Sequence, residues 1–167
     1  RNLVNSRHPL RQRRKGVRIN DKMPLYAFEY LQSQYQGSLS GKKVLLLGVS
    51  YLNDVGDTRY TPVEGFYNQL EAAGAIITLH DPHVLYWEEK DTWITQDLTK
   101  LLEQDYDIIT ITTGHKEYRS NPALLAKMLE KQEAFIYDTI GVLTNEEIGT
   151  LSGKHKVRVL GRGDLQQ

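Results

Sequence analysis

Charged side chains that could hold an anion follow the first apolar run of the chain, residues 44–47. Asp54, Asp57 and Arg59 lie in a long polar stretch that ends at Thr61-Pro62, where three signals predict a helix start: a Thr cap, Pro at the first position and Glu64 closing a capping box. The guanidinium of Arg59 and the free N–H groups of that helix could bind one anion together. An ion pair of Arg59 with Asp54 or Asp57 is the equally plain alternative.

Two further residues could serve a site from the ends of later apolar runs. His115, beside Lys116 and Glu117, could be a general base or a phosphate contact, although a single loop histidine is commonly neither. Asp81 stands where a dinucleotide-binding fold places its ribose acceptor, or Asp81-Pro82 is simply a turn. The first turn, 48–53, reads GVSYLN and lacks the Gly-x-Gly-x-x-Gly fingerprint, so we expect no independent dinucleotide binding.

Metal and thiolate chemistry find little support in the sequence. The chain has no cysteine, which excludes a Cys nucleophile and a disulfide within it. Apart from His80-x-x-His83, the five histidines show no spacing typical of zinc ligands. We therefore predict no metal site.

Apolar runs that alternate with helical patterns must position these side chains. Strands are predicted over 44–47, 75–80, 108–112, 134–138 and 157–161, and helices over 23–37, 62–73, 96–103 and 122–129, with a capping box at 144–147. A polar excursion is expected at 87–91. The alternation predicts an α/β fold, a three-layer, doubly wound, Rossmann-like parallel sheet of about five strands. The strand ends 48–59, 80–81, 112–118 and 138–141 should then converge on one ligand site.

Composition bounds the class of protein. The 167 residues suit one domain, with 40% apolar residues and no apolar run long enough to cross a bilayer, so we expect a cytoplasmic protein without a membrane partner. Residues 1–18 carry seven Lys or Arg and no acid, which leaves the remainder at a net charge of −7. An acidic body argues against nucleic acid as the partner. Residues 1–20 are predicted to be an extended basic lead-in.

Four segments in a fixed order carry a family resemblance. They are the lead-in 19–24 (INDKMP), the loop 48–59 that ends DVGDTR, the strand end 80–82 (HDP) and the strand 135–138 (FIYD). Over residues 17–161 the chain resembles the C-terminal part of the UDP-glucose/GDP-mannose dehydrogenase family. The resemblance implies a parent of three parts: an NAD-binding domain, a helical middle domain and a nucleotide-sugar-binding domain. We accordingly expect 21–40 to be a connecting helix from the middle domain and 41–163 to be the nucleotide-sugar-binding domain.

The resemblance also implies a chemistry and residue roles. The family oxidises a sugar C6 alcohol twice, to a carboxylate, with NAD and an upstream thiol, so no catalytic residue is expected in this chain. Arg59 matches the arginine that reaches the NAD of the first domain, and Tyr51 matches an aromatic residue beside the nucleotide sugar. Leu52 stands where a substrate-binding lysine is usual, and Thr139-Ile140-Gly141 stands where an arginine often follows Asp138. The tip 114–118 looks like the variant in relatives that act on UDP-N-acetylhexosamines or their uronic acids.

Two hypotheses follow. In the first, the chain is the UDP-sugar-binding domain of an NAD-dependent nucleotide-sugar 6-dehydrogenase of polysaccharide biosynthesis, inactive alone, with upstream domains as partners and a homo-oligomeric parent. Its predicted substrate-binding residues are Tyr51, Leu52, Asn53, His115 and Asp138, and its predicted cofactor contact is Arg59. In the second, the chain is a non-catalytic interaction or regulatory module that kept a Rossmann-like scaffold.

Overall fold

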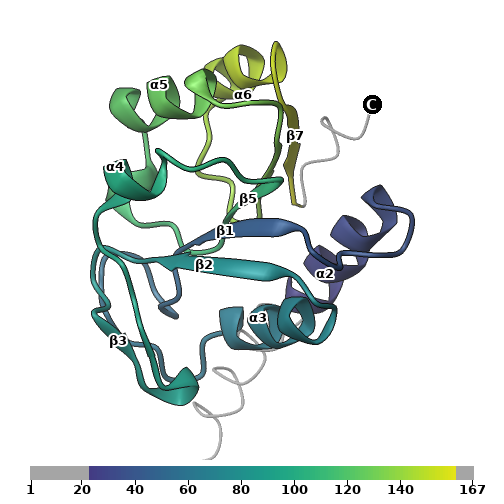
Figure 1. The fold of residues 1–167 in the computed structure, drawn as a ribbon. Coiled ribbons are helices and arrows are strands. Elements are labelled where there is room, and N and C mark those ends of the chain that lie inside the picture. The colour runs from purple at the N-terminus through teal and green to yellow at the C-terminus, as the bar shows by residue number, and fades with distance from the viewer. Residues whose placement is uncertain (1–22, 161–167) are drawn as a thin grey trace, which may run out of the picture.

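A parallel five-stranded sheet forms the centre of the protein (Figure 1). The computed structural model describes residues 23–160, so the predicted basic lead-in 1–20 and residues 161–163 of the predicted domain lie outside the described residues. The strand order is β2-β1-β5-β6-β7. These strands are β1 (Lys43–Leu47), β2 (Ile76–His80), β5 (Ile108–Ile111), β6 (Phe135–Asp138) and β7 (Lys156–Val159). The predicted doubly wound α/β fold is confirmed.

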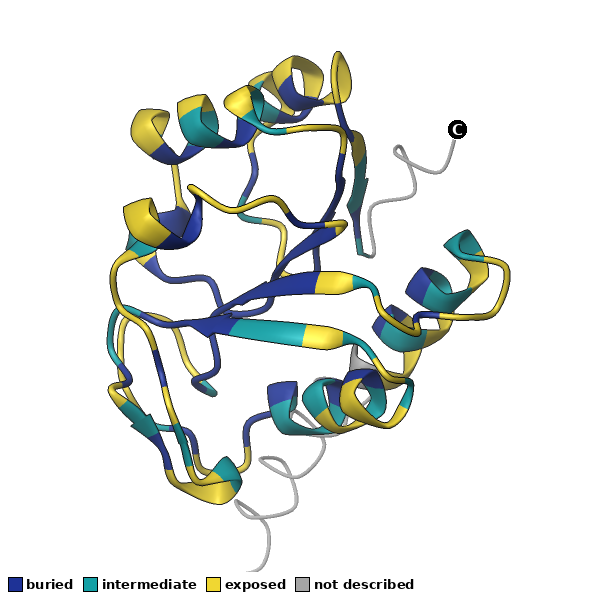
Figure 2. Ribbon diagram, viewed as in Figure 1, coloured by how far each residue is buried: buried dark blue, intermediate teal, exposed yellow. Residues whose placement is uncertain are grey.

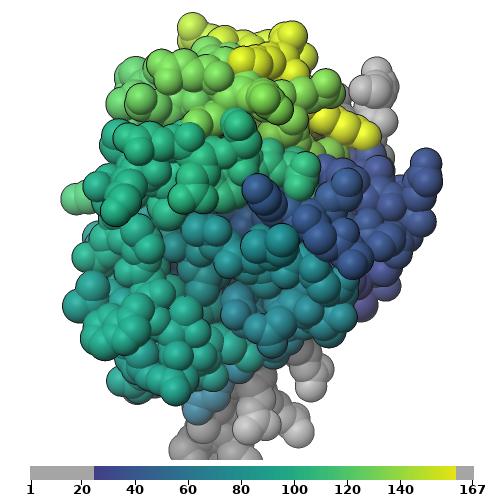
Figure 3. Space-filling view, in the orientation of Figure 1, coloured from purple at the N-terminus to yellow at the C-terminus, as the bar shows by residue number. Residues whose placement is uncertain are grey.

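Helices cover both faces of this sheet. One face carries α2 (Met23–Gln34) and α3 (Val63–Ala72), and the other carries α4 (Leu98–Leu101), α5 (Pro122–Glu130) and α6 (Asn145–Ser152). The strands are largely buried, whereas the outward sides of the helices are exposed (Figure 2). In the space-filling view, the blue and teal segments of the first part of the chain lie against the green and yellow segments of the second part (Figure 3). The three layers of the prediction are therefore present.

The sheet separates two hydrophobic cores. Val44 and Leu46 of β1 point into the core under α2 and α3, and Leu45 and Leu47 point into the core under α4, α5 and α6. All four side chains are fully buried. Alternate residues of a strand face opposite sides of a sheet, so an unbroken apolar run is what a strand covered on both faces requires.

The capping boxes predicted at two helix starts differ in outcome: the box at α6 forms and the box at α3 does not. At α6 the predicted capping box forms, because Thr144 Oγ1 accepts from the N–H of Glu147 and the Glu147 carboxylate accepts from the N–H of Thr144. At α3 the predicted box is wrong. Thr61 Oγ1 accepts from the N–H of Val63 at 3.3 Å, but the Glu64 carboxylate turns to Lys90 Nζ, 3.6 Å away. Glu64 thus pairs with Lys90, which is near in space but distant in sequence, and the local bond of a capping box does not form.

The stretch predicted as a polar excursion is an ordered hairpin. Strands β3 (Tyr86–Trp87) and β4 (Thr92–Trp93) pair antiparallel around the short 3₁₀ helix η1 (Glu88–Lys90). Trp87 is fully buried and its ring meets Tyr67 of α3 edge-on, with centroids 5.4 Å apart. The hairpin therefore extends the α2–α3 core beyond the sheet.

Within residues 23–160, no helix has both the length and the apolar character that crossing a bilayer would need. The described part of the predicted connecting segment is α2, whose Ala27 and Leu31 are fully buried in the first core.

Candidate functional site

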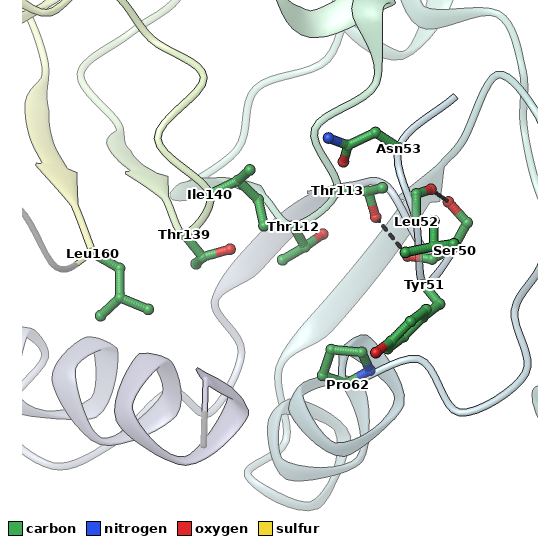
Figure 4. Close-up of a pocket in the computed structure, with 10 residues that line it drawn as sticks. All are labelled: Ser50, Tyr51, Leu52, Asn53, Pro62, Thr112, Thr113, Thr139, Ile140 and Leu160. Atoms are coloured by element: carbon green, nitrogen blue, oxygen red, sulfur yellow. Dashed lines mark hydrogen bonds between the residues drawn. The ribbon is translucent and has the colours of Figure 1, made fainter. Parts of the chain in front are cut away.

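A pocket of about 400 Å³ opens at the carboxyl ends of the strands (Figure 4). Its walls come from the segments that follow β1, β5, β6 and β7 and from the start of α3. The chain order reverses between β1 and β5, and this is the position at which doubly wound sheets bind ligands. The lining residues are Ser50, Tyr51, Leu52, Asn53, Pro62, Thr112, Thr113, Thr139, Ile140 and Leu160.

Hydrogen bonds tie the loop after β1 to the tip after β5. Thr113 Oγ1 donates to the carbonyl of Ser50 at 2.9 Å, and Asn53 Oδ1 accepts from the N–H of Gly114 at 2.9 Å. The two segments also approach very closely at Gly48, which has φ +104°: a Cβ there would stand 2.4 Å from Thr113 Cβ. The wall of the pocket is thus built in advance of any ligand.

His115 lies behind this wall, fully buried. Its Nδ1 accepts from the N–H of Asp54 at 2.8 Å, so the ring proton is on Nε2. Nε2 lies 2.9 Å from Asp81 Oδ2 and 3.0 Å from Ser50 Oγ. Both ring nitrogens are therefore engaged within the protein, and His115 is not among the residues that line the pocket.

Asp81 holds the other side of the same network. Its Oδ2 accepts from the N–H of Val49 at 2.8 Å and of Ser50 at 3.3 Å, and its Oδ1 accepts from the N–H of His83 at 2.8 Å. Burial alone would raise the pKa of Asp81, but the bonds from His115, Val49 and His83 outweigh it and lower the pKa. Asp81 thus forms a turn, as one sequence hypothesis had it, and the same carboxylate also fixes the loop after β1.

Asp138 plays a similar part after β6. Its Oδ1 accepts from the N–H of Ile140 and Gly141, and its Oδ2 accepts from the N–H of Leu143 at 2.9 Å. The side chain is fully buried, and this burial raises its pKa although the backbone bonds oppose the shift. Asp138 shapes the segment that carries Thr139 and Ile140, but it does not line the pocket.

Arg59 forms the ion pair that was the alternative to anion binding. Its Nε donates to Asp57 Oδ1 at 3.0 Å and its Nη2 lies 2.9 Å from Asp57 Oδ2. The guanidinium hydrogen bonds lower the pKa of Asp57 to about 2. The pair is solvent-exposed and stands outside the pocket lining, and the role of Arg59 in cofactor contact stays a prediction.

The structure brings together three of the five predicted substrate residues, Tyr51, Leu52 and Asn53, in the pocket wall. His115 and Asp138 support that wall from behind, and the binding roles of all five remain predictions. Sequence reasoning placed Thr139 and Ile140 at a strand end expected to reach the site, but it did not name Pro62 or Leu160 as lining residues. The available signal was that Pro62 stands at a predicted helix start and Leu160 near the end of a predicted strand.

One group of side chains has ligand types suited to a metal ion. Atoms of Asp54, His83 and His115 lie within 4.8 Å of one another. However, His115 already accepts at Nδ1 and donates at Nε2, and Nε2 of His83 is 3.1 Å from Glu117 Oε2. A metal would have to displace these bonds, so the residues present do not fit a preformed metal site.

The loop after β1 does not fit a dinucleotide either. Residues 48–62 separate β1 from α3, in place of a short glycine-rich turn. The N–H groups of Val49 and Ser50, which would face a pyrophosphate in such a turn, are bonded to the Asp81 carboxylate. The described residues thus lack the cradle that NAD requires in a Rossmann domain.

Fold and pocket together define a Rossmann-like α/β domain with a pocket at the switch point of its sheet, a fold that it shares with a solved dehydrogenase. Residues 45–145 match the UDP-glucose/GDP-mannose dehydrogenase family, UDP binding domain, and the chain belongs to this family.

Individual relatives agree with this assignment. The UDP-N-acetyl-D-mannosamine dehydrogenase of Methanococcus vannielii is 26% identical over 153 residues, which are 90% of this chain and 34% of that protein. UDP-glucose 6-dehydrogenase 1 of Arabidopsis thaliana is 36% identical over 69 residues, 41% of this chain and 14% of that protein. The crystal structure of an NDP-N-acetyl-D-galactosaminuronic acid dehydrogenase from Methanosarcina mazei Go1 superposes with a TM-score of 0.71 at 28% identity, covering 87% of this chain and 30% of that one. The chain spans about a third of the first and third of these relatives.

Proposed function

We propose that this chain is the nucleotide-sugar-binding domain of an NAD-dependent nucleotide-sugar 6-dehydrogenase and that it binds a UDP-sugar in the pocket at the ends of β1, β5 and β6. The observation that carries the proposal is the coincidence of that pocket with the switch point of the sheet, inside the segment that matches the UDP binding domain. The activities of the relatives, UDP-N-acetyl-D-mannosamine and UDP-glucose dehydrogenases, support the substrate class.

The chemistry of the whole enzyme would then need parts beyond this chain. Oxidation of a C6 alcohol to a carboxylate sends two hydrides to two NAD⁺, and water supplies the second oxygen. This chain has neither a cysteine nor a dinucleotide cradle among its described residues, so we expect it to be inactive alone. A cytoplasmic location, a homo-oligomeric parent, upstream domain partners and the contact of Arg59 with NAD stay predictions of the same hypothesis.

A thermal-shift titration with UDP, a UDP-sugar, GDP and NAD tests the proposal. A ligand at about 100 times its dissociation constant stabilises a fold by roughly 2.7 kcal/mol, which is readily measured. We expect UDP compounds to raise the midpoint and NAD to leave it unchanged. Tyr51→Ala should abolish the shift with UDP, whereas Tyr26→Ala, at an exposed tyrosine of α2, should retain it.

Two outcomes would count against the proposal. Stabilisation by NAD with no response to UDP compounds would sink it outright. No response to any of the four ligands would favour the non-catalytic module, for which the uncharged pocket is the supporting observation.

A further inference from the structure

Among the described residues, the pocket wall carries no charged side chain. All ten lining residues are neutral, and the two most exposed apolar ones are Leu52 and Ile140, with 56% and 43% of their surface accessible. A diphosphate brings two or more negative charges, which proteins usually meet with Arg, Lys or backbone N–H groups. The side chains of this lining offer no positive charge.

Five backbone N–H groups near the pocket are also occupied. The Asp81 carboxylate takes those of Val49 and Ser50, and the Asp138 carboxylate takes those of Ile140, Gly141 and Leu143. Each carboxylate therefore occupies the N–H groups at a strand end to which the anion of a ligand would otherwise bind. Since both acids are fully buried, a ligand cannot replace them without unfolding the loops that they hold.

The start of α3 is closed in the same way. Pro62, which lines the pocket, has no N–H to offer. The N–H of Val63 donates to Thr61 Oγ1 and the N–H of Glu64 donates to the carbonyl of Thr61. The helix end that reaches the pocket therefore satisfies its first donors internally.

The three threonine hydroxyl groups of the lining donate their hydrogen bonds to backbone carbonyls. Thr112 Oγ1 donates to the carbonyl of Gly48, Thr113 Oγ1 to that of Ser50, and Thr139 Oγ1 to that of Ile111, at 2.6, 2.9 and 2.7 Å. A hydroxyl that has donated its proton still has lone pairs to accept with. The three threonine oxygens can therefore accept hydrogen bonds from a ligand, which suits sugar hydroxyls and an imide N–H and does not suit phosphate oxygens, since these are acceptors themselves.

We infer that the described lining of the pocket takes the uncharged nucleoside end of its ligand and offers the phosphates no charged side chain. The inference rests on the proposed function and adds that the neutral, acceptor-rich wall sets which part of the nucleotide sugar this domain holds. Among the described cations, Arg119 lies near the pocket wall. Its Nη2 and the Oδ1 of Asn53 both lie 2.8 Å from where a Cβ on Gly114 would stand, but Arg119 is not in the lining.

Calorimetric titration of the chain with uridine, UMP and UDP tests this inference. We expect the three dissociation constants to agree within about threefold and to stay so between about 50 mM and about 500 mM NaCl, because no ion pair is there to be screened. Arg119→Gln should leave binding of UDP unchanged. A UDP affinity about tenfold or more above that of uridine, or a loss of UDP affinity alone in Arg119→Gln, overturns the inference.

An introduced charge gives the positive control. Leu52→Lys, at an exposed position of the lining, should make UDP bind better than uridine, and high salt should remove that preference. Leu85→Lys makes the same change at a leucine that is 59% exposed and outside the lining, and it should have no effect. A Leu52→Lys variant with the wild-type ratio of affinities contradicts a nucleoside seated here. If none of the three ligands binds the wild-type chain, the proposed function itself fails.

Discussion

Nε2 of His115 donates a hydrogen bond to Asp81 Oδ2 over 2.9 Å, and solvent reaches neither side chain. This pair joins the tip after β5 to the turn after β2 across the end of β1. Through the N–H groups of Val49, Ser50 and Asp54 it also fixes the backbone of the loop that lines the pocket. The pair is thus a support for the site, placed one layer behind the residues that a ligand would touch.

Removal of the imidazole should therefore cost stability. We expect His115→Ala to lower the free energy of unfolding by about 2–4 kcal/mol, because it leaves buried polar groups without partners and opens a cavity. His83→Ala, at a side chain that is 28% exposed and paired with Glu117, should cost less than about 1 kcal/mol. Urea denaturation of both variants gives the comparison, and equal losses would refute the supporting role.

Glycine substitutions should separate steric contact from backbone conformation. Gly48 and Gly141 both have positive φ, +104° and +91°, but a Cβ on Gly48 would collide with Thr113, whereas a Cβ on Gly141 meets nothing within 4 Å. We expect Gly141→Ala to cost about 1–2 kcal/mol from φ alone, and Gly48→Ala to cost about 3 kcal/mol or more. Thermal unfolding measures both. A Gly48→Ala variant as stable as Gly141→Ala would show that the two loops can move apart.

The exposed ion pair predicts one pH dependence. Arg59 lowers the pKa of Asp57 to about 2 from its ordinary 3.8, so the pair favours the folded state above pH 4 and this contribution is lost as the pH falls through about 2. Arg59→Gln should return the pKa of Asp57 to its ordinary range. Carboxyl ¹³C NMR titration follows that residue directly. A wild-type pKa near 3.8 would show that the pair does not persist in solution.

The two tryptophans should give separate fluorescence signals. Trp87 is fully buried against Tyr67, whereas Trp93 is 72% exposed on the same hairpin. We expect iodide to quench the emission of Trp93 and to spare that of Trp87, so Trp93→Phe should leave a blue-shifted emission that iodide barely changes. Strong quenching in Trp93→Phe would mean that the β3–β4 hairpin opens away from the core.

Local sequence predicted most of the fold because local physics decides it. The apolar runs mark strands buried on both faces, and the capping box at Thr144 formed as predicted since its partner lies three residues away. At Glu64 the prediction failed because a lysine from a distant segment competes for the carboxylate. The prediction of a polar excursion at 87–91 failed because Trp87 stands beside a run of charged residues and is nevertheless buried by tertiary packing.

The candidate site was less predictable than the fold. The strand ends that form the pocket follow from topology, and Tyr51, Leu52 and Asn53 lie where the sequence suggested. The sequence could not tell that His115 and Asp138 point into the protein. His115 is held by the N–H of Asp54 in another loop, and Asp138 is held by N–H groups of the segment that follows it, such as that of Leu143. Nearly every residue type supplies a backbone N–H, so no sequence motif records such partners.

The position of β1 between two cores has a consequence for how the domain opens. Its alternate side chains belong to opposite cores, so neither helical layer can detach without exposing one face of this strand to water. Amide protons of β1 should accordingly exchange with deuterium only through global unfolding, while the exposed ends of α2 and the β3–β4 hairpin exchange through local openings. A ligand that bridges the loops after β1 and β5 would then slow exchange across the entire sheet, and it would protect residues that it never touches.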